Sequence, residues 1–123
     1  MNLFKKIFGR QTSNGNSSTM LTQTRIQGRL YGFAWTILEK RDPNFNGDQL
    51  KGNPIGTVIM SSMSYATDNE TAVISKLLDV LKTAPKSSAT NENAEGIKGG
   101  LEGKLVIYNN INPEVLLSSN DIK

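Results

Sequence analysis

Oxygen-bearing side chains recur at alternate positions in one short stretch of the chain. They are Asp42, Asn44, Asn46 and Asp48, with Gly47 among them. This spacing resembles the start of a calcium loop, in which alternate oxygens converge on the ion and glycine permits the tight turn. The bidentate glutamate needed at the twelfth position is replaced by Asn53. Because Asp-Pro and Asn-Gly also form ordinary turns, we expect a plain loop here and no bound metal.

Most catalytic chemistry is excluded by composition. The chain has 123 residues with no cysteine and no histidine, so thiol nucleophiles, Ser-His triads, disulfides and Cys/His zinc sites are all impossible. The serines of residues 61–64 have no neighbouring acid or base, and the glycines of residues 96–103 lack the Gly-Lys-Ser/Thr of a phosphate loop. We therefore expect no enzyme, no cofactor and no small-molecule substrate.

The first ten residues combine apolar and basic side chains. Leu3, Phe4, Ile7 and Phe8 form one apolar stripe if the segment is helical, and the basic residues beside it are Lys5, Lys6 and Arg10. We call residues 1–10 the N-terminal arm. Residues 11–24 are rich in Ser, Thr, Asn and Gln, which is typical of a flexible linker. The arm is therefore predicted to act at a distance from the rest of the chain.

Charge and length limit what the arm can contact. The net charge is +3, and three basic residues lie in the arm, so the remaining chain is balanced. The apolar run is too short for a secretory signal or a membrane span. Three interpretations remain open, namely attachment to an anionic membrane surface, docking to a neighbouring subunit, and a terminus that is frayed or packed on its own domain. We expect a cytoplasmic protein, or one at the cytoplasmic face of a membrane, that is not secreted.

Residues 25–38 alternate with period two, which is typical of a strand. One face carries Arg25, Gln27, Arg29, Tyr31, Phe33, Trp35 and Ile37. A glycine at position 28 or 32 is expected to bend this strand. The rings either fill the core under a helix, or form a basic-aromatic surface on which single-stranded nucleic acid stacks. The residues of the second interpretation are Arg25, Arg29, Tyr31, Phe33 and Trp35.

The rest of the chain predicts further strands at residues 57–60 and 104–108, and a loop over 83–100. Thr67 and Glu70 have the spacing of a capping box, which predicts a helix after Tyr65. Its apolar stripe is Val73, Ile74, Leu77, Leu78 and Leu81. Asn112 is predicted to cap a short helix that begins at Pro113.

The expected fold class is α+β. A small, curved and mostly antiparallel sheet, or a partly open barrel, is covered by one amphipathic helix, and the amphipathic N-terminal arm precedes it. The expected division is arm 1–10, linker 11–24 and a single domain 25–123. The function predicted from the sequence is a non-enzymatic binding and assembly protein, with a protein partner or self-association. The alternative hypothesis is a single-stranded nucleic-acid-binding protein.

Overall fold

The computed structural model describes residues 20–122, and in this part of the chain every regular element is a helix. The α-helices are α1 (Gln23–Arg41), α2 (Gly47–Leu50), α3 (Ile55–Met63), α4 (Asp68–Leu81) and α5 (Glu92–Tyr108), followed by the 3₁₀ helix η3 (Pro113–Leu117). The predicted α+β class is therefore wrong. The protein is all-α over the described residues, which contain neither the curved sheet nor a barrel.

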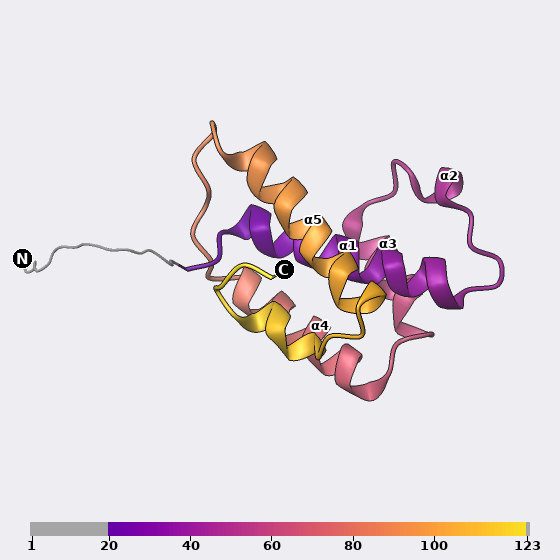
Figure 1. The fold of residues 1–123 in the computed structure, drawn as a ribbon. Helices are drawn as coiled ribbons and strands as arrows, with labels where there is room; N and C mark the ends of the chain where they lie inside the picture. Colours follow the sequence, from indigo (N-terminus) through magenta and orange to yellow (C-terminus); the bar gives the residue numbers. More distant parts are fainter. Residues whose placement is uncertain (1–19, 123) are drawn as a thin grey trace, which may run out of the picture.

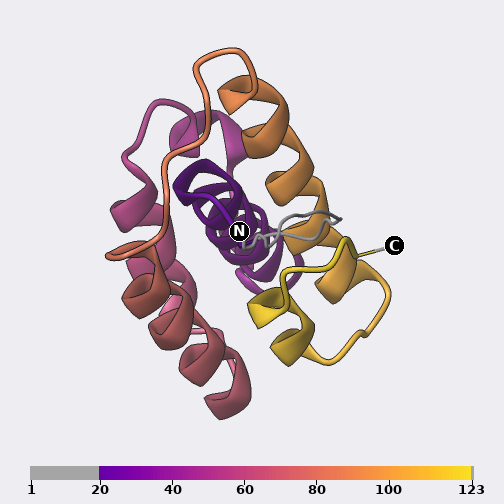
Figure 2. The ribbon, with the colours of Figure 1, turned by 90° about the vertical axis from the view of Figure 1, so that its left-hand side faces the viewer.

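Helix α1 lies at the centre of the fold, with α3 and α4 on one side and α5 on the other, and η3 packs against both α4 and α5 (Figures 1 and 2). It begins at Thr22, whose side chain accepts a hydrogen bond from the Arg25 amide at 3.2 Å. It ends before Pro43, because the α conformation is disfavoured at a residue that precedes proline. Contacts on several sides explain why α1 supplies so much of the core.

The predicted strand at residues 25–38 is wrong because a helical pattern is superimposed on the alternating rings. The side chains of α1 that reach the apolar core are Ile26, Leu30, Phe33, Ala34, Ile37 and Leu38. Their spacing of three and four residues is that of one helix face. Phe33 points into the core, whereas Tyr31 and Trp35, four residues apart, stack on each other with ring centroids 5.7 Å apart.

The strand predicted at residues 57–60 is also wrong, since these residues belong to α3. Pro54 precedes the first turn, where a missing amide hydrogen costs nothing. The buried residues Val58, Ile59 and Ser62 again have helical spacing, and the Ser62 hydroxyl donates to the Ile59 carbonyl at 2.7 Å. Helical periodicity thus decides the structure of this short segment.

Helix α4 confirms the predicted capping box. The Glu70 amide donates to the Thr67 hydroxyl at 3.1 Å, and the Thr67 amide donates to the Glu70 carboxylate at 2.8 Å. Arg41, in the last turn of α1, forms a second pair of hydrogen bonds with Glu70, at 2.6 and 3.0 Å. Burial would raise the pKa of Glu70, but these hydrogen bonds outweigh it and lower the pKa. Glu70 therefore both caps α4 and ties it to α1.

Helix α5 occupies residues predicted to be a loop and a strand. The loop prediction for 83–100 fails from Glu92 onward, and the strand prediction for 104–108 fails entirely. The helix ends where Asn110 adopts a φ of 52°, a conformation that asparagine tolerates at helix ends. Asn112 then accepts a hydrogen bond from the Glu114 amide at 3.1 Å. The predicted cap of the short helix at Pro113 is confirmed, although this helix is 3₁₀.

Candidate functional site

Helices α1 and α5 approach so closely that their backbones meet. The residues at the contact are Gly28 and Gly32 of α1 and Gly96, Gly99, Gly100 and Gly103 of α5. A Cβ atom added at Gly32 would lie 2.8 Å from the carbonyl carbon of Gly100, and one at Gly28 would lie 2.9 Å from the Gly100 amide nitrogen. Both distances are shorter than nonbonded contact between these atoms allows. Glycine is therefore needed for this contact, which fixes the rotation of α5 about its axis.

A buried ion cluster lies beside the glycine contact. Glu102 of α5 accepts hydrogen bonds from Arg25 at 2.7 Å through each carboxylate oxygen, and from Arg29 at 2.9 Å. The side chains of Arg29 and Glu102 are 0% and 3% exposed. Burial would raise the pKa of Glu102, but the hydrogen bonds from the two arginines outweigh it and lower the pKa to about 2. The cluster is therefore ionised and internally paired at neutral pH.

The same cluster holds the segment that follows η3. Arg29 donates to the carbonyl oxygens of Leu116, Ser118 and Asn120 at 2.8, 2.6 and 2.9 Å. The Ile122 amide donates to Glu102 at 3.0 Å. Because all three nitrogens of Arg29 and both carboxylate oxygens of Glu102 already take part in hydrogen bonds, the cluster is a structural clamp and leaves little capacity for a ligand.

Asp121 extends the clamp to the protein surface. It receives hydrogen bonds from Lys98 and from Arg25, both at 2.7 Å. Both hydrogen bonds lower the pKa of Asp121, to about 2, and the bond from Lys98 has the larger effect. Lys98 is thereby directed toward the C-terminal segment.

On its other side, α5 exposes large apolar side chains. Ile97, Leu101 and Tyr108 are 59%, 57% and 46% exposed, and their spacing of four and seven residues places them on one face of the helix. We call these three residues the outer face of α5. The Tyr108 hydroxyl donates to Glu39, which raises the pKa of Tyr108, and the Lys40 ammonium lies 5.3 Å from the centre of its ring. The Tyr108 end of the face is thus fixed to α1.

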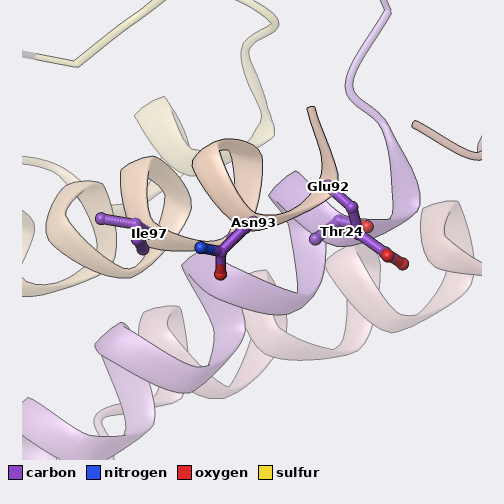
Figure 3. Close-up of a pocket in the computed structure, with 5 residues that line it drawn as sticks. Thr24, Glu92, Asn93 and Ile97 are labelled. Atoms are coloured by element: carbon purple, nitrogen blue, oxygen red, sulfur yellow. The ribbon is translucent and has the colours of Figure 1, made fainter. Parts of the chain in front are cut away.

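The other end of the outer face borders a shallow pocket between the first turns of α1 and α5. The pocket has a volume of about 470 Å³ and is lined by Thr24, Glu92, Asn93, Gly96 and Ile97 (Figure 3). Close by, the Thr22 hydroxyl donates to Glu95 at 3.1 Å. The described chain therefore starts beside the first turn of α5, at the end of the outer face that carries Ile97.

The five residues of the predicted nucleic-acid surface are not gathered on one exposed face. Arg25 and Arg29 are buried in the ion cluster, and Phe33 is in the core. Tyr31 and Trp35 are half-buried and lie side by side. Trp35 also meets the edge of Phe45, with ring centroids 5.5 Å apart. The structure therefore brings only the two stacked rings together.

Two side chains of the calcium-loop resemblance accept hydrogen bonds from backbone amides, and one of them, Asn46, caps α2. Asp42 accepts a hydrogen bond from the Asn44 amide at 2.8 Å, and Asn46 accepts one from the Asp48 amide at 3.0 Å. Asp48 lies 3.5 Å from Lys51, and both side chains are largely exposed. Residues 20–122 contain no group of three acidic side chains placed to hold a metal ion. This stretch is the connection between α1 and α2 and the first turn of α2.

The predicted membrane or subunit contact lies outside the described residues. It comprises Leu3, Phe4, Lys5, Lys6, Ile7, Phe8 and Arg10. Between residues 20 and 122, no helix combines the length and the apolar character that crossing a bilayer requires.

The outer face of α5 is the feature that sequence reasoning missed. Ile97 fell in the predicted loop, Tyr108 in the predicted strand and Leu101 between the two, so no common face was predicted for them. One signal could have identified the helix: Gly28 and Gly32, Gly96 and Gly100, and Gly99 and Gly103 are each four residues apart. Small residues at this spacing allow two helices to approach closely.

No match was found for this chain among protein families, curated proteins or solved structures. The geometry of the site is therefore the basis for proposing a function.

Proposed function

We propose that this protein is a non-enzymatic binding and assembly protein that attaches to a neighbouring subunit or a membrane surface through its N-terminal arm. The observation that carries the proposal is the outer face of α5. Single exposed apolar residues are common, but several on one helix face are typical of interaction surfaces. Ile97, Leu101 and Tyr108 are such a set within the described residues.

The charged groups of the body support the same proposal. The buried arginines are paired with Glu102, and Arg41 is paired with Glu70. The excess positive charge of the whole chain corresponds to the three basic residues of the arm. Attachment by the arm therefore combines apolar burial with a local positive charge, while the body contributes an apolar face.

The binding free energies expected for the arm are those of a reversible attachment. Full burial of a large apolar side chain contributes roughly 1.5–3 kcal/mol, and a basic residue near an anionic leaflet contributes about 1 kcal/mol. Leu3, Phe4, Ile7 and Phe8 are four such apolar residues, and partial burial gives only a fraction of this energy each. Ordering the arm costs part of that gain. We expect binding that is readily reversed and sensitive to salt.

The test uses the full-length chain with two substitutions, Phe4→Asp and Phe8→Asp. Sedimentation with vesicles that contain anionic lipid and measurement of the mass in solution address the two kinds of target. We expect the substitutions to reduce vesicle binding or self-association relative to the natural chain. Val80→Asp is a matched control, because Val80 is an exposed apolar residue of α4, 45% exposed. If the arm substitutions change neither measurement, the proposal is wrong.

A second candidate function, binding of single-stranded nucleic acid, is favoured by one observation. The half-buried rings of Tyr31 and Trp35 stack together, and a stacked base can contribute about 1–3 kcal/mol. Because Arg25 and Arg29 are engaged with Glu102, this candidate relies on the rings. Titration of an oligonucleotide at low salt, followed by Trp35 fluorescence, is expected to show quenching; unchanged fluorescence would remove this candidate.

A further inference from the structure

We infer that in the free chain the N-terminal arm docks on the outer face of α5 of the same molecule. When the arm attaches to a target, it exchanges this intramolecular contact for the contact with the target. The inference rests on the proposed function, because it concerns the same arm. It adds a competing intramolecular site that controls when the arm is available. Exchange of the arm between two copies would make the same contact between subunits.

The position of the chain favours this occupant. The described chain starts at Met20, and Thr24 lines the same pocket as Ile97. Residues 11–19 connect the arm to this point and can span about 30 Å when extended, at 3.3–3.6 Å per residue. The outer face of α5, from Ile97 to Tyr108, runs along about 17 Å of helix at 1.5 Å per residue. The whole face is therefore within reach of the arm.

The apolar side chains of the two partners are compatible in spacing. Leu3 and Ile7, like Phe4 and Phe8, are four residues apart. On α5, Ile97 and Leu101 have the same separation. Apolar residues at this spacing align on one face of a helix and pack against a similar face. Within residues 20–122, Ile97 and Leu101 are more than half exposed, which leaves room for a covering segment.

The charges are complementary at the end of the face nearest the linker. Glu92 and Glu95 occupy the first turn of α5, whereas Lys5, Lys6 and Arg10 are the basic residues of the arm. The negative charge of Glu95 is partly compensated by Arg25, 3.5 Å away, and Glu92 is exposed. Lys98 is drawn toward Asp121. A basic segment lying over the first turn of α5 would therefore meet mainly negative charge.

A linked segment needs little intrinsic affinity to occupy such a surface. A short flexible linker gives an effective concentration in the millimolar range. The arm of a second copy competes with this only when the protein itself is concentrated or when several contacts form at once. For this reason we assign the arm to the face of its own chain and not to that of a second copy.

The absence of natural cysteine permits a direct test in the full-length chain. Phe4→Cys is combined with Leu101→Cys in one variant and with Val80→Cys in the control. Val80 is also exposed, and Pro85, shortly after the end of α4, accepts a hydrogen bond from Gln23 at 2.8 Å. The linker can therefore reach both sites. The rate of disulfide formation in dilute protein under mild oxidant is measured, and the products are separated by size.

The inference predicts a monomeric disulfide that forms at least about tenfold faster with Leu101→Cys than with Val80→Cys. Adding Glu92→Lys to the Phe4→Cys and Leu101→Cys variant is expected to slow the reaction at low salt. Equal rates for the two pairs, or a product that is mainly dimeric, would overturn the inference.

Failure of the inference can be separated from failure of the proposed function. Equal cross-linking rates, together with vesicle binding or self-association that depends on Phe4 and Phe8, contradict only the intramolecular docking. A fast monomeric cross-link, without any effect of these phenylalanines on vesicle binding or mass, supports the docking and contradicts the proposed function.

Discussion

Replacing Gly32 with alanine tests the contact that orients α5. In a helix interior, alanine is normally more stable than glycine by roughly 0.5–1 kcal/mol. Here the added Cβ would collide with the backbone of Gly100, whose carbonyl carbon lies 2.8 Å away. Forcing extra atoms into a packed contact costs about 1–3 kcal/mol. Because the obstacle is backbone, neither helix can relieve it by a side-chain rotation, and we expect net destabilisation of about 1–2 kcal/mol.

Gly56→Ala is the matched control. Gly56 lies within α3, and a Cβ atom there would meet nothing within 4 Å. We expect this variant to be stabilised by roughly 0.5–1 kcal/mol. The two variants are compared by urea denaturation followed by circular dichroism. For a domain of this size, each kcal/mol also shifts the melting temperature by about 4–8 °C. If Gly32→Ala stabilised the protein as much as Gly56→Ala, the close helix contact would be wrong.

Three further predictions concern the ion cluster, the capping box and the outer face of α5. The pKa of Glu102 is lowered from 4.5 to about 2, so the stability that this group contributes is retained above pH 4.5 and lost as the pH falls toward 2, by about 3 kcal/mol in all. Urea denaturation from pH 7 to 2 should show this loss. The loss should be smaller for Glu102→Gln, a variant that we expect to be less stable than the natural chain at pH 7. Thr67→Ala should lower the free energy of unfolding by about 1 kcal/mol, measured in the same way, and an unchanged value would mean that the cap is unimportant. Leu101→Ser should leave the thermal midpoint within about 2–4 °C, because exposed substitutions have small effects; a large decrease would show that Leu101 belongs to the core.

The parts of the fold that the sequence predicted correctly are those with local signals. Thr67 and Glu70 satisfy helix-end groups within one turn, and Asn112 does the same before Pro113. Such caps depend on residues a few positions apart, so no knowledge of the tertiary structure is needed. They identified α4 and η3.

Helix α1 was mispredicted because two periodicities coincide in it. The rings at positions 31, 33 and 35 alternate like those of a strand, while Ile26, Leu30 and Ile37 follow the helical repeat. Over the full length of α1 the helical repeat accounts for the core side chains. Over a few residues the alternation of the rings is the stronger pattern, whereas over a longer stretch the helical repeat is the stronger one.

Helix α5 was missed because its glycines oppose helix formation locally. Each glycine costs about 1 kcal/mol relative to alanine in a helix, and α5 contains Gly96, Gly99, Gly100 and Gly103. The contact with α1 compensates for this cost, because a Cβ atom at Gly99 or Gly103 would collide with the backbone of α1. The outer face of α5 depends on that contact, so it could not be recognised before residues 92–108 were known to be helical.

The central claim is that Ile97 and Leu101 form the surface on which the N-terminal arm docks, and are not simply the exposed edge of the core. Methyl NMR spectra of the full-length chain, recorded with and without the substitutions Phe4→Asp and Phe8→Asp, test it most directly. We predict that the methyl signals of Ile97 and Leu101 shift while those of Val80 stay in place. Unchanged signals at Ile97 and Leu101 would contradict the claim.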